Sequence, residues 1–196
     1  MAERKYKKIV IGIDQSYTRT GISISADGKL KASKSLDFKG LKTKTEKRNL
    51  IRREIENILS KNIGKAKEII IIVERMRSFS SNNQSYSGNV KYIKATSSLI
   101  SSIVDVAFDF GIKVYSVDTS AWKRQVVGTT EQMENSYGVN PKKWPTILFV
   151  EEQLGECVHY TNKLGNIKYD DDRADSICIS LYGFVQGKFR KLKLEE

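Results

Sequence analysis

Lys8-Ile9-Val10-Ile11-Gly12-Ile13-Asp14-Gln15-Ser16 is an apolar run that ends in a carboxylate. Its short length and its β-branched residues predict a central strand over residues 8–14 rather than a helix. An acid at the end of a buried strand is costly to desolvate unless it meets a cation. Asp14 therefore predicts a metal ion or a basic partner, and the only nearby basic residues are Lys7, Lys8 and Arg19.

Two later segments also place acids beside apolar structure. Ile69-Ile70-Ile71-Ile72-Val73 leads directly into Glu74, and Asp172-Arg173-Ala174-Asp175 opens the last predicted helix. A helical crossover precedes the strand that ends at Glu74, so this strand should run parallel to the first and end at the same edge. At 100° per residue, Asp172 and Asp175 fall on adjacent faces near the helix start. These acids, together with Asp14, predict a divalent-metal site.

Simpler structural roles compete with metal binding at some of these positions. An ion pair with a neighbouring arginine would explain Glu74, and an N-cap role would explain Asp172, in competition with Asp170 and Asp171. Asp175 lies one turn into the helix, beside its apolar stripe, where a capping role does not explain it. We therefore expect Asp175 to be the more secure ligand of the pair.

Length and charge limit the class of protein. The 196 residues are enough for one domain with a substantial core, so we predict a single domain over 1–196. Lysine and arginine number 34 against 23 acids, and the net charge of +11 is spread along the chain. A basic balance of this size favours a polyanionic partner, and nucleic acid is the leading candidate.

The small numbers of cysteines and histidines and the absence of a long apolar run argue against a disulfide-rich protein, a usual zinc-binding protein and a membrane protein. Cys157 and Cys178 are too few for a disulfide framework, and with one histidine they do not make a four-ligand zinc site of the usual kinds. We expect free thiols and a surface position for His159. No apolar run is long enough to span a membrane, and Met1-Ala2-Glu3-Arg4-Lys5 is not followed by a signal-peptide core. The expectation is a soluble, cytoplasmic protein with no membrane partner.

Hydrophobic periodicity predicts alternating strands and helices along the rest of the chain. Strands are expected over 20–26 and 30–38, joined by the turn Asp27-Gly28, and over 68–74 and 112–117. Helices are expected from Thr45 to about Leu59, over 93–110, over 119–127 with Asp118 as N-cap and over 172–186. Another helix is expected within 141–154, where Pro145 limits the start to about that residue. Residues 78–88 and 155–171 are expected to be irregular loops.

Aromatic residues divide into two groups by their surroundings. Trp122 and Trp144 are expected to lie in the core. Phe79 and Tyr86 lie in a Ser/Asn-rich segment that has no core to join. We expect these two rings to stack on unpaired bases, in contacts worth about 1 to 3 kcal/mol each.

The order of elements resembles the ribonuclease H-like fold, and the motifs resemble the RuvC family of Holliday junction resolvases. Gly12-Ile13-Asp14-Gln15-Ser16 with Thr20-Gly21 is similar to the family's first motif, and Ile71-Ile72-Val73-Glu74 to its second. Asp172-Arg173-Ala174-Asp175-Ser176 is similar to the terminal motif, and Trp122-Lys123-Arg124-Gln125-Val126-Val127-Gly128 to a lysine-bearing segment. The resemblance covers nearly the whole chain.

Some positions depart from the bacterial members of the family. Gln15-Ser16 stands where those proteins usually have Pro-Gly, and Ser176 replaces an alanine. The segments 78–91 and 155–171 are also longer. In these features the chain is more similar to resolvases carried by phages, which process branched DNA in the bacterial host cytoplasm.

The resemblance implies an α/β fold, with a five-stranded mixed sheet in the order 3-2-1-4-5 flanked by helices. It also implies a metal-dependent, structure-selective endodeoxyribonuclease that resolves four-way junctions by paired symmetric nicks, and related flaps and three-way junctions. Two Mg²⁺ ions per site are implied, with Mn²⁺ as a substitute. Asp14 would bridge both ions, Glu74 and Asp172 would complete one shell each, and Asp175 would ligate or help position the attacking water.

Further residues are implied to handle DNA. Lys123, as a catalytic lysine, together with Arg124, Lys142 and Lys143, would neutralise the phosphate backbone. Phe79 is the nearest match to an aromatic residue that wedges into the junction. The family acts as homodimers, and the apolar helix over 93–110 is the expected interface.

Two alternatives stay open from the sequence alone. The actin-like and sugar-kinase ATPases share a Gly-Ile-Asp motif, but this chain is short for their two domains and has no Gly-Gly pair. We therefore expect no nucleotide cofactor. A non-catalytic protein that binds branched DNA would explain the basic charge but not the gathered acids.

Overall fold

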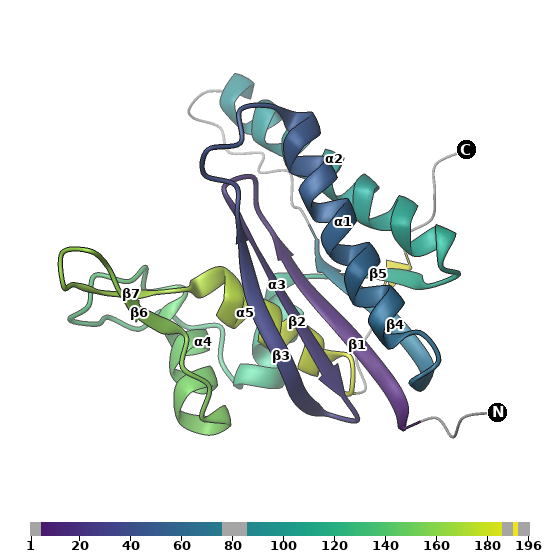
Figure 1. The fold of residues 1–196 in the computed structure, drawn as a ribbon. Helices are drawn as coiled ribbons and strands as arrows, with labels where there is room; N and C mark the ends of the chain where they lie inside the picture. The colour runs from purple at the N-terminus through teal and green to yellow at the C-terminus, as the bar shows by residue number, and fades with distance from the viewer. Residues whose placement is uncertain (1–4, 76–85, 186–189, 192–196) are drawn as a thin grey trace.

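The computed structural model describes residues 5–75, 86–185 and 190–191, and it is built around one mixed sheet (Figure 1). The strand order is β3-β2-β1-β4-β5-β8, so the predicted order 3-2-1-4-5 is confirmed and a short strand extends it. The strands are β1 (Tyr6–Gln15), β2 (Arg19–Ala26), β3 (Lys29–Asp37), β4 (Ala66–Glu74), β5 (Lys113–Val117) and β8 (Arg190–Lys191).

The direction of each strand decides where the acids lie. Strands β1, β2 and β3 form an antiparallel meander, whereas β4 runs parallel to β1 and β5 runs parallel to β4. In the β1–β4 register Ile13 is opposite Val73, so Asp14 and Glu74 follow at the same edge. The Gln15 side chain donates to the Glu74 carbonyl at 2.6 Å and joins the two strand ends.

Helices cover both faces of the sheet. They are α1 (Lys44–Asn62), α2 (Tyr86–Asp109), α3 (Thr119–Trp122), η1 (Lys123–Val127), α4 (Trp144–Leu148), η2 (Phe149–Gln153) and α5 (Asp171–Tyr182), where η marks π-helical turns. Helices α1 and α2 lie on one face, and α3, α4 and α5 lie on the other (Figure 1). Successive side chains of β1 point to opposite faces of the sheet. Ile9, Ile11 and Ile13 therefore join the core under α1, and Val10 joins the core under α5.

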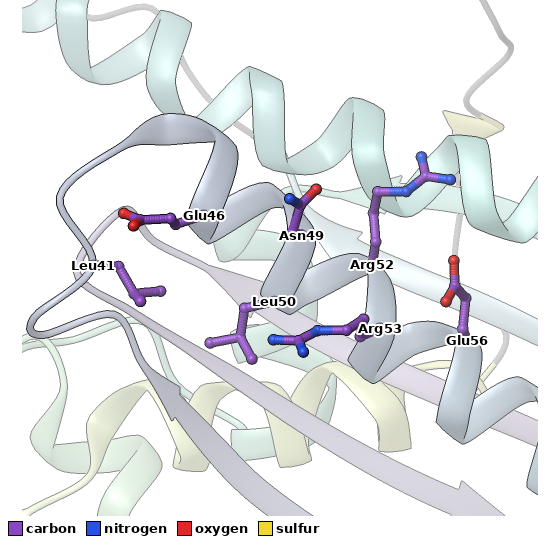
Figure 2. Close-up of a pocket in the computed structure, with 7 residues that line it drawn as sticks. All are labelled: Leu41, Glu46, Asn49, Leu50, Arg52, Arg53 and Glu56. Atoms are coloured by element: carbon purple, nitrogen blue, oxygen red, sulfur yellow. The ribbon is translucent and has the colours of Figure 1, made fainter.

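Helix α1 shows why its sequence forms a helix at this place. Thr43 accepts a hydrogen bond from the Glu46 amide at 3.1 Å, and Glu46 accepts one from the Thr43 amide at 2.8 Å, which makes a capping box. Ile51, Ile55 and Leu59 are fully buried in the core between α1 and the sheet. A shallow hollow on this helix contains none of the predicted site residues (Figure 2); it is lined by Leu41, Glu46, Asn49, Leu50, Arg52, Arg53 and Glu56.

The segment 155–171 differs from the expected irregular loop. It contains a hairpin of β6 (His159–Thr161) and β7 (Ile167–Tyr169) that projects beyond the sheet (Figure 1). Its turn is closed by the Asn162 amide, which donates to the Asn166 carbonyl at 2.9 Å, and by Gly165 at a φ of 78°. Both strands are short and almost entirely exposed, so they carry no hydrophobic alternation for a sequence pattern to detect.

The predicted helices also differ in their bounds. Helix α2 begins at Tyr86, so residues 86–88 are helical rather than part of a loop, and residues 78–85 of that loop lie outside the described part of the chain. The helix predicted within 141–154 begins at Trp144, close to the start that Pro145 sets, because proline fits the first turn of a helix but not its interior. The predicted helix over 119–127 divides into α3 and η1.

Asp118 occupies the N-cap position of α3 as predicted, but its side chain makes no capping hydrogen bond. Its carboxylate lies 3.6 Å from the Arg75 guanidinium instead. Trp122 and Trp144 are buried, as expected. Within the described residues, no helix combines the length and the apolar character that a membrane crossing needs.

Candidate metal centre

Two glycines allow α5 to lie unusually close to the sheet. A Cβ atom at Gly12 would lie 2.4 Å from the Ser176 carbonyl oxygen, and one at Gly21 would lie 1.9 Å from the Asp172 carbonyl oxygen. The Ser23 hydroxyl also donates to the Ser176 carbonyl at 2.6 Å. The glycines of the first sequence motif therefore have a steric role, because they bring the start of α5 to the end of β1.

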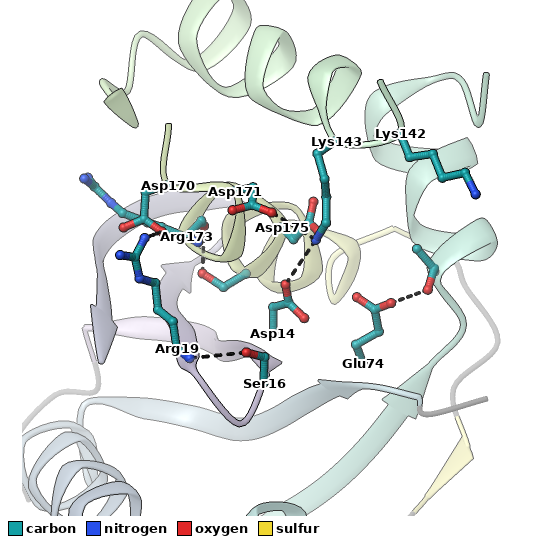
Figure 3. A network of polar contacts seen from close by, with 12 residues as sticks. Asp14, Ser16, Arg19, Glu74, Lys142, Lys143, Asp170, Asp171, Arg173 and Asp175 are labelled. Atoms are coloured by element: carbon teal, nitrogen blue, oxygen red, sulfur yellow. Dashed lines mark hydrogen bonds and ion pairs between the residues drawn. The ribbon is translucent and has the colours of Figure 1, made fainter. Parts of the chain in front are cut away.

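This packing gathers acids from three elements. Asp14 at the end of β1, Glu74 at the end of β4 and Asp175 in α5 each offer a carboxylate oxygen, and these oxygens lie within 4.8 Å of one another (Figure 3). Asp14 is 8% exposed and Asp175 is 1% exposed. We call these three residues the carboxylate cluster. Residues that are up to 161 positions apart therefore share one buried locus.

The aspartates before Asp175 divide the remaining roles. Asp170 is the N-cap of α5: its side chain accepts from the Arg173 amide at 3.1 Å and from the Ser35 hydroxyl at 2.9 Å. Asp172 is outside the carboxylate cluster but close enough for its charge to raise the pKa of Asp14. The competition for the cap is therefore resolved in favour of Asp170, and Asp172 lies beside the cluster.

Burial and mutual repulsion disfavour the charged forms of these acids. Desolvation raises the pKa of Asp14 well above its ordinary value; the Lys143 charge opposes this, and the charges of Glu74 and Asp175 add to it. Burial also raises the pKa of Glu74. The pKa of Asp172 is raised to about 7, first by burial and then by the Asp171 carboxylate. Such shifts mark a site that favours a bound cation.

Lys143 supplies a cation to the carboxylate cluster. Its ammonium group contacts Asp175 directly and lies 3.7 Å from the carboxylates of both Asp14 and Asp171 (Figure 3). Burial alone would lower the pKa of Lys143, but the neighbouring carboxylates raise it well above its ordinary value. The contacts of Lys143 with these acids were not predicted, and the DNA contact that the resemblance implies for it stays a prediction.

The donor set fits a hard divalent cation. Asp175 Oδ1 is buried and has no hydrogen-bond partner among the described residues, although Oδ2 contacts Lys143. An unsatisfied carboxylate oxygen of this kind is costly unless a cation or a water reaches it. Glu74 accepts from the Thr119 hydroxyl, while Arg75 pairs with Asp118; Arg77, the other arginine that could pair with Glu74, lies outside the described residues. All ligand atoms are oxygens, the type that Mg²⁺ prefers.

The other residues predicted to contact DNA have different surroundings. Lys123 is buried and donates to the Lys142 carbonyl at 2.6 Å, whereas Lys142 and Arg124 are exposed. Lys142 points away from the acids (Figure 3). Phe79 lies outside the described residues, and Tyr86 is the first residue of α2, with its side chain also outside them.

A basic hollow beside Asp172 was not predicted. It is lined by Thr18, Arg19, Asp37, Phe38, Lys39, Lys47 and Asp172, so three cations and a second carboxylate border Asp172. Lys47 is largely buried, and its ammonium group lies 3.6 Å from the centre of the Tyr17 ring. Neither this hollow nor the position of Lys143 has a signal in the sequence, because each depends on contacts between distant segments.

Comparisons with known proteins identify the fold. No protein-family model matches the sequence, and no curated protein matches it. The structure of T. thermophilus RuvC in complex with a Holliday junction substrate matches with a TM-score of 0.63 at 16% identity, covering 94% of this chain and 99% of that chain. A second T. thermophilus RuvC structure matches with a TM-score of 0.60 at 16% identity over the same shares. The yeast mitochondrial Holliday junction resolvase Ydc2 matches with a TM-score of 0.54 at 14% identity, covering 92% and 79%. The chain therefore has the ribonuclease H-like fold of RuvC, as predicted.

Proposed function

We propose that this chain is a metal-dependent endonuclease that resolves Holliday junctions and related branched DNA by paired nicks. The observation that carries the proposal is the carboxylate cluster, in which a buried Asp175 oxygen lacks a partner among the described residues. Support comes from the shared fold, since one matching RuvC structure holds a Holliday junction substrate. The net charge of +11 also suits a polyanionic substrate.

Asp14, Glu74 and Asp175 would hold Mg²⁺, with Asp172 as a further ligand from the adjoining turn. Two bound ions would activate a water molecule and stabilise the leaving oxygen of a phosphodiester. Mn²⁺ should replace Mg²⁺, because both prefer oxygen ligands. Asp14 is the candidate to contact both ions, since its carboxylate offers an oxygen within 4.8 Å of those of Glu74 and Asp175 (Figure 3).

Basic residues on two sides of the carboxylate cluster would orient the DNA backbone. Arg19, Lys39 and Lys47 border the hollow beside Asp172, where they would hold phosphates near the reacting bond. Lys143 neutralises the acids when no metal is bound and would turn to a substrate phosphate once metal ions replace it. Lys123 would act through the Lys142 carbonyl, by fixing the segment that carries Lys143.

A homodimer would provide two active sites for two symmetric nicks. Helix α2 is the proposed interface: Arg48 and Arg52 of α1 contact one side of it, through Ser102 and Asp105. Phe108 near its C-terminal end is 67% exposed and offers an apolar side chain to a partner subunit. Sedimentation that finds a monomer even with a junction bound would contradict this part of the proposal.

The test is cleavage of labelled branched DNA by the purified full chain. We expect Mg²⁺-dependent paired nicks in a four-way junction, weaker cutting of three-way junctions and flaps, and none in a linear duplex. Asp14→Asn should lower the nicking rate by at least about a thousandfold, because several kcal/mol of charge stabilisation by metal would be lost. Junction binding should persist in this variant.

Asp118→Asn is the matched control. Asp118 follows β5 as Asp14 ends β1, but it pairs with Arg75 and is not a member of the carboxylate cluster. Its nicking rate should stay within about threefold of the wild type. If Asp14→Asn nicks as fast as the wild type, the mechanism is wrong. If the wild type binds junctions but cuts none with Mg²⁺ or Mn²⁺, a non-catalytic DNA-binding role replaces the proposal.

A further inference from the structure

The hairpin of β6 and β7 carries a second group of candidate ligands, separate from the carboxylate cluster. Glu151 in η2, Cys157 before β6 and His159 at its start each offer one ligand atom, and these atoms lie within 4.8 Å of one another. We propose that Glu151, Cys157 and His159 form a zinc-binding site. We call these three residues the hairpin cluster, and the proposal is independent of the nuclease function.

Strand geometry explains why two ligands two residues apart converge. Side chains alternate along an extended chain, so Cys157 and His159 share a side while Val158 between them points the other way. Val158 is 1% exposed in the core, and its carbonyl accepts from the Asp170 amide at 2.8 Å. The anchored Val158 therefore holds both ligand side chains outward on one side.

Glu151 approaches from the other segment and is already held in place. Its Oε1 accepts from the Val158 amide at 3.1 Å and lies 2.7 Å from His159 Nδ1. The His159 ring also packs edge-on against Tyr169, with ring centres 5.8 Å apart. The Cys157 thiol donates to the His159 carbonyl at 3.4 Å. Backbone and ring contacts thus fix all three ligand-bearing residues without a metal.

The ligand chemistry favours zinc over the magnesium expected at the carboxylate cluster. A thiolate, an imidazole and a carboxylate are the ligands that Zn²⁺ takes at about 2.0 to 2.3 Å. Tetrahedral bonds of that length separate the ligand atoms by about 3.3 to 3.7 Å, so small rotations of exposed side chains suffice. One thiolate and one carboxylate also carry two negative charges, which balance one divalent ion.

Zinc binding would connect η2 to the base of the hairpin, two parts of the chain that precede α5. The Cys157 thiol would lose its proton to solvent as the sulfur–zinc bond forms, and His159 would bind as the neutral imidazole. Three protein ligands leave a fourth position for water. The ion would fix the base of the hairpin to η2, and β7 leads directly into Asp170 and α5. Zinc would therefore stabilise the segment that precedes the α5 acids.

The experiment measures metal binding rather than DNA cleavage. The full chain with Asp14→Asn, which weakens the carboxylate cluster, is stripped with a chelator and titrated with zinc chloride, and separately with cobalt chloride. We expect one zinc per chain and thiolate-to-cobalt charge-transfer absorption. Cys157→Ser and His159→Gln should each weaken zinc binding by more than about a hundredfold, since even changes outside the inner ligand shell cost about 10- to 100-fold.

Cys178→Ala is the matched thiol control, because Cys178 is buried in α5 and far from the three ligands in sequence. It should retain the zinc affinity and the cobalt spectrum. Circular dichroism checks that the exposed Cys157→Ser variant is folded. The proposal is overturned if the parent chain binds no zinc, or if Cys157→Ser and His159→Gln bind zinc as tightly as the parent. It is also overturned if restoring Asp14 is needed for binding, because the zinc would then occupy the carboxylate cluster.

Discussion

The carboxylate cluster and the hairpin cluster are two candidate metal sites built in opposite ways. The first is buried, contains only oxygen ligands and combines β1, β4 and α5 across most of the chain. The second is largely exposed, offers sulfur, nitrogen and oxygen, and uses residues within a nine-residue span. The carboxylate cluster therefore depends on the packing of the whole sheet, whereas the hairpin cluster depends on one turn and one anchored residue.

The largest expected effect that separates the two clusters comes from Gly21→Ala. The added Cβ would lie 1.9 Å from the Asp172 carbonyl oxygen. Because the strand at Gly21 and the helix at Asp172 meet through backbone atoms, no side chain can turn aside, and α5 must move away from β2. We expect a loss of at least about 3 kcal/mol in the free energy of unfolding, at the upper end of overpacking costs. The Gly21→Ala chain should also lose the rise in Tm that Mg²⁺ causes in the wild type. Calorimetry with and without Mg²⁺ measures both effects.

Gly165→Ala is the control for this prediction. Gly165 has a φ of 78° in the hairpin turn, and no atom lies within 4 Å of its added Cβ, so only local strain results. We expect a loss of about 1 kcal/mol and an unchanged Mg²⁺-induced rise in Tm. Equal responses to Mg²⁺ in the two variants would mean that the approach of α5 does not control the carboxylate cluster.

The sequence predicted the carboxylate cluster because physical rules connect it to local patterns. The helical crossover makes the two apolar strands parallel, so Asp14 and Glu74, which end them, must lie at the same edge of the sheet. The apolar stripe of α5 packs on the sheet and so orients Asp175 toward it. The sheet order 3-2-1-4-5 came instead from the resemblance to the ribonuclease H-like fold, and the structure confirms it. The contacts of Lys143 with the acids were not predicted, because no pattern in an irregular segment indicates that its ammonium group will meet carboxylates from other elements.

The hairpin cluster was missed for a different reason. His159 was expected at the surface, and exposure is what the structure finds, but its neighbours were not foreseen. A three-residue strand with both faces exposed has no hydrophobic alternation, so the sequence does not show which way its side chains point. The burial of Val158 in the structure shows that Cys157 and His159 point to the opposite side. Glu151 then joins them through a bend at Gly155, which has a φ of 67°.

Lys143→Gln should produce the next largest effect, and only at the carboxylate cluster. Without metal, the acids would lose the ammonium that neutralises them, so stability should fall by about 2 kcal/mol, less than for a fully enclosed pair because the Lys143 side chain is 28% exposed. With Mg²⁺, no ammonium competes for the carboxylates, so the metal-induced rise in Tm should exceed that of the wild type. Unfolding measured in both conditions gives the two values.

Lys142→Gln removes a neighbouring lysine whose side chain is exposed and points away from the acids (Figure 3). Its unfolding free energy should stay within about 0.5 kcal/mol of the wild type. Zinc affinity at the hairpin cluster should be unchanged in both lysine variants. A Lys143→Gln chain as stable as the wild type without metal would show that the ammonium does not neutralise the carboxylate cluster in solution.

The smallest effect expected at the carboxylate cluster is its dependence on pH. Because the pKa of Asp172 is raised to about 7 in the folded chain, its carboxyl group stabilises the metal-free fold below its unfolded pKa. That contribution is lost as the pH rises through about 7. Metal binding has the opposite dependence, since the ligand must be ionised. Mg²⁺ affinity should therefore rise about tenfold per pH unit for this one proton, up to about pH 7, and then become less steep.

The change of Mg²⁺ affinity with pH is measured by calorimetric titration of the chain with Mg²⁺ at several pH values between about 5.5 and 8.5. Burial also raises the pKa values of Asp14 and Glu74, so more than one proton contributes below neutral pH. Asp172→Asn should therefore reduce the slope by one proton rather than abolish it. A slope that Asp172→Asn leaves unchanged would mean that Asp172 is not coupled to the ion. The metal would then be held by the three residues of the carboxylate cluster alone, and Asp172 would serve only the start of α5.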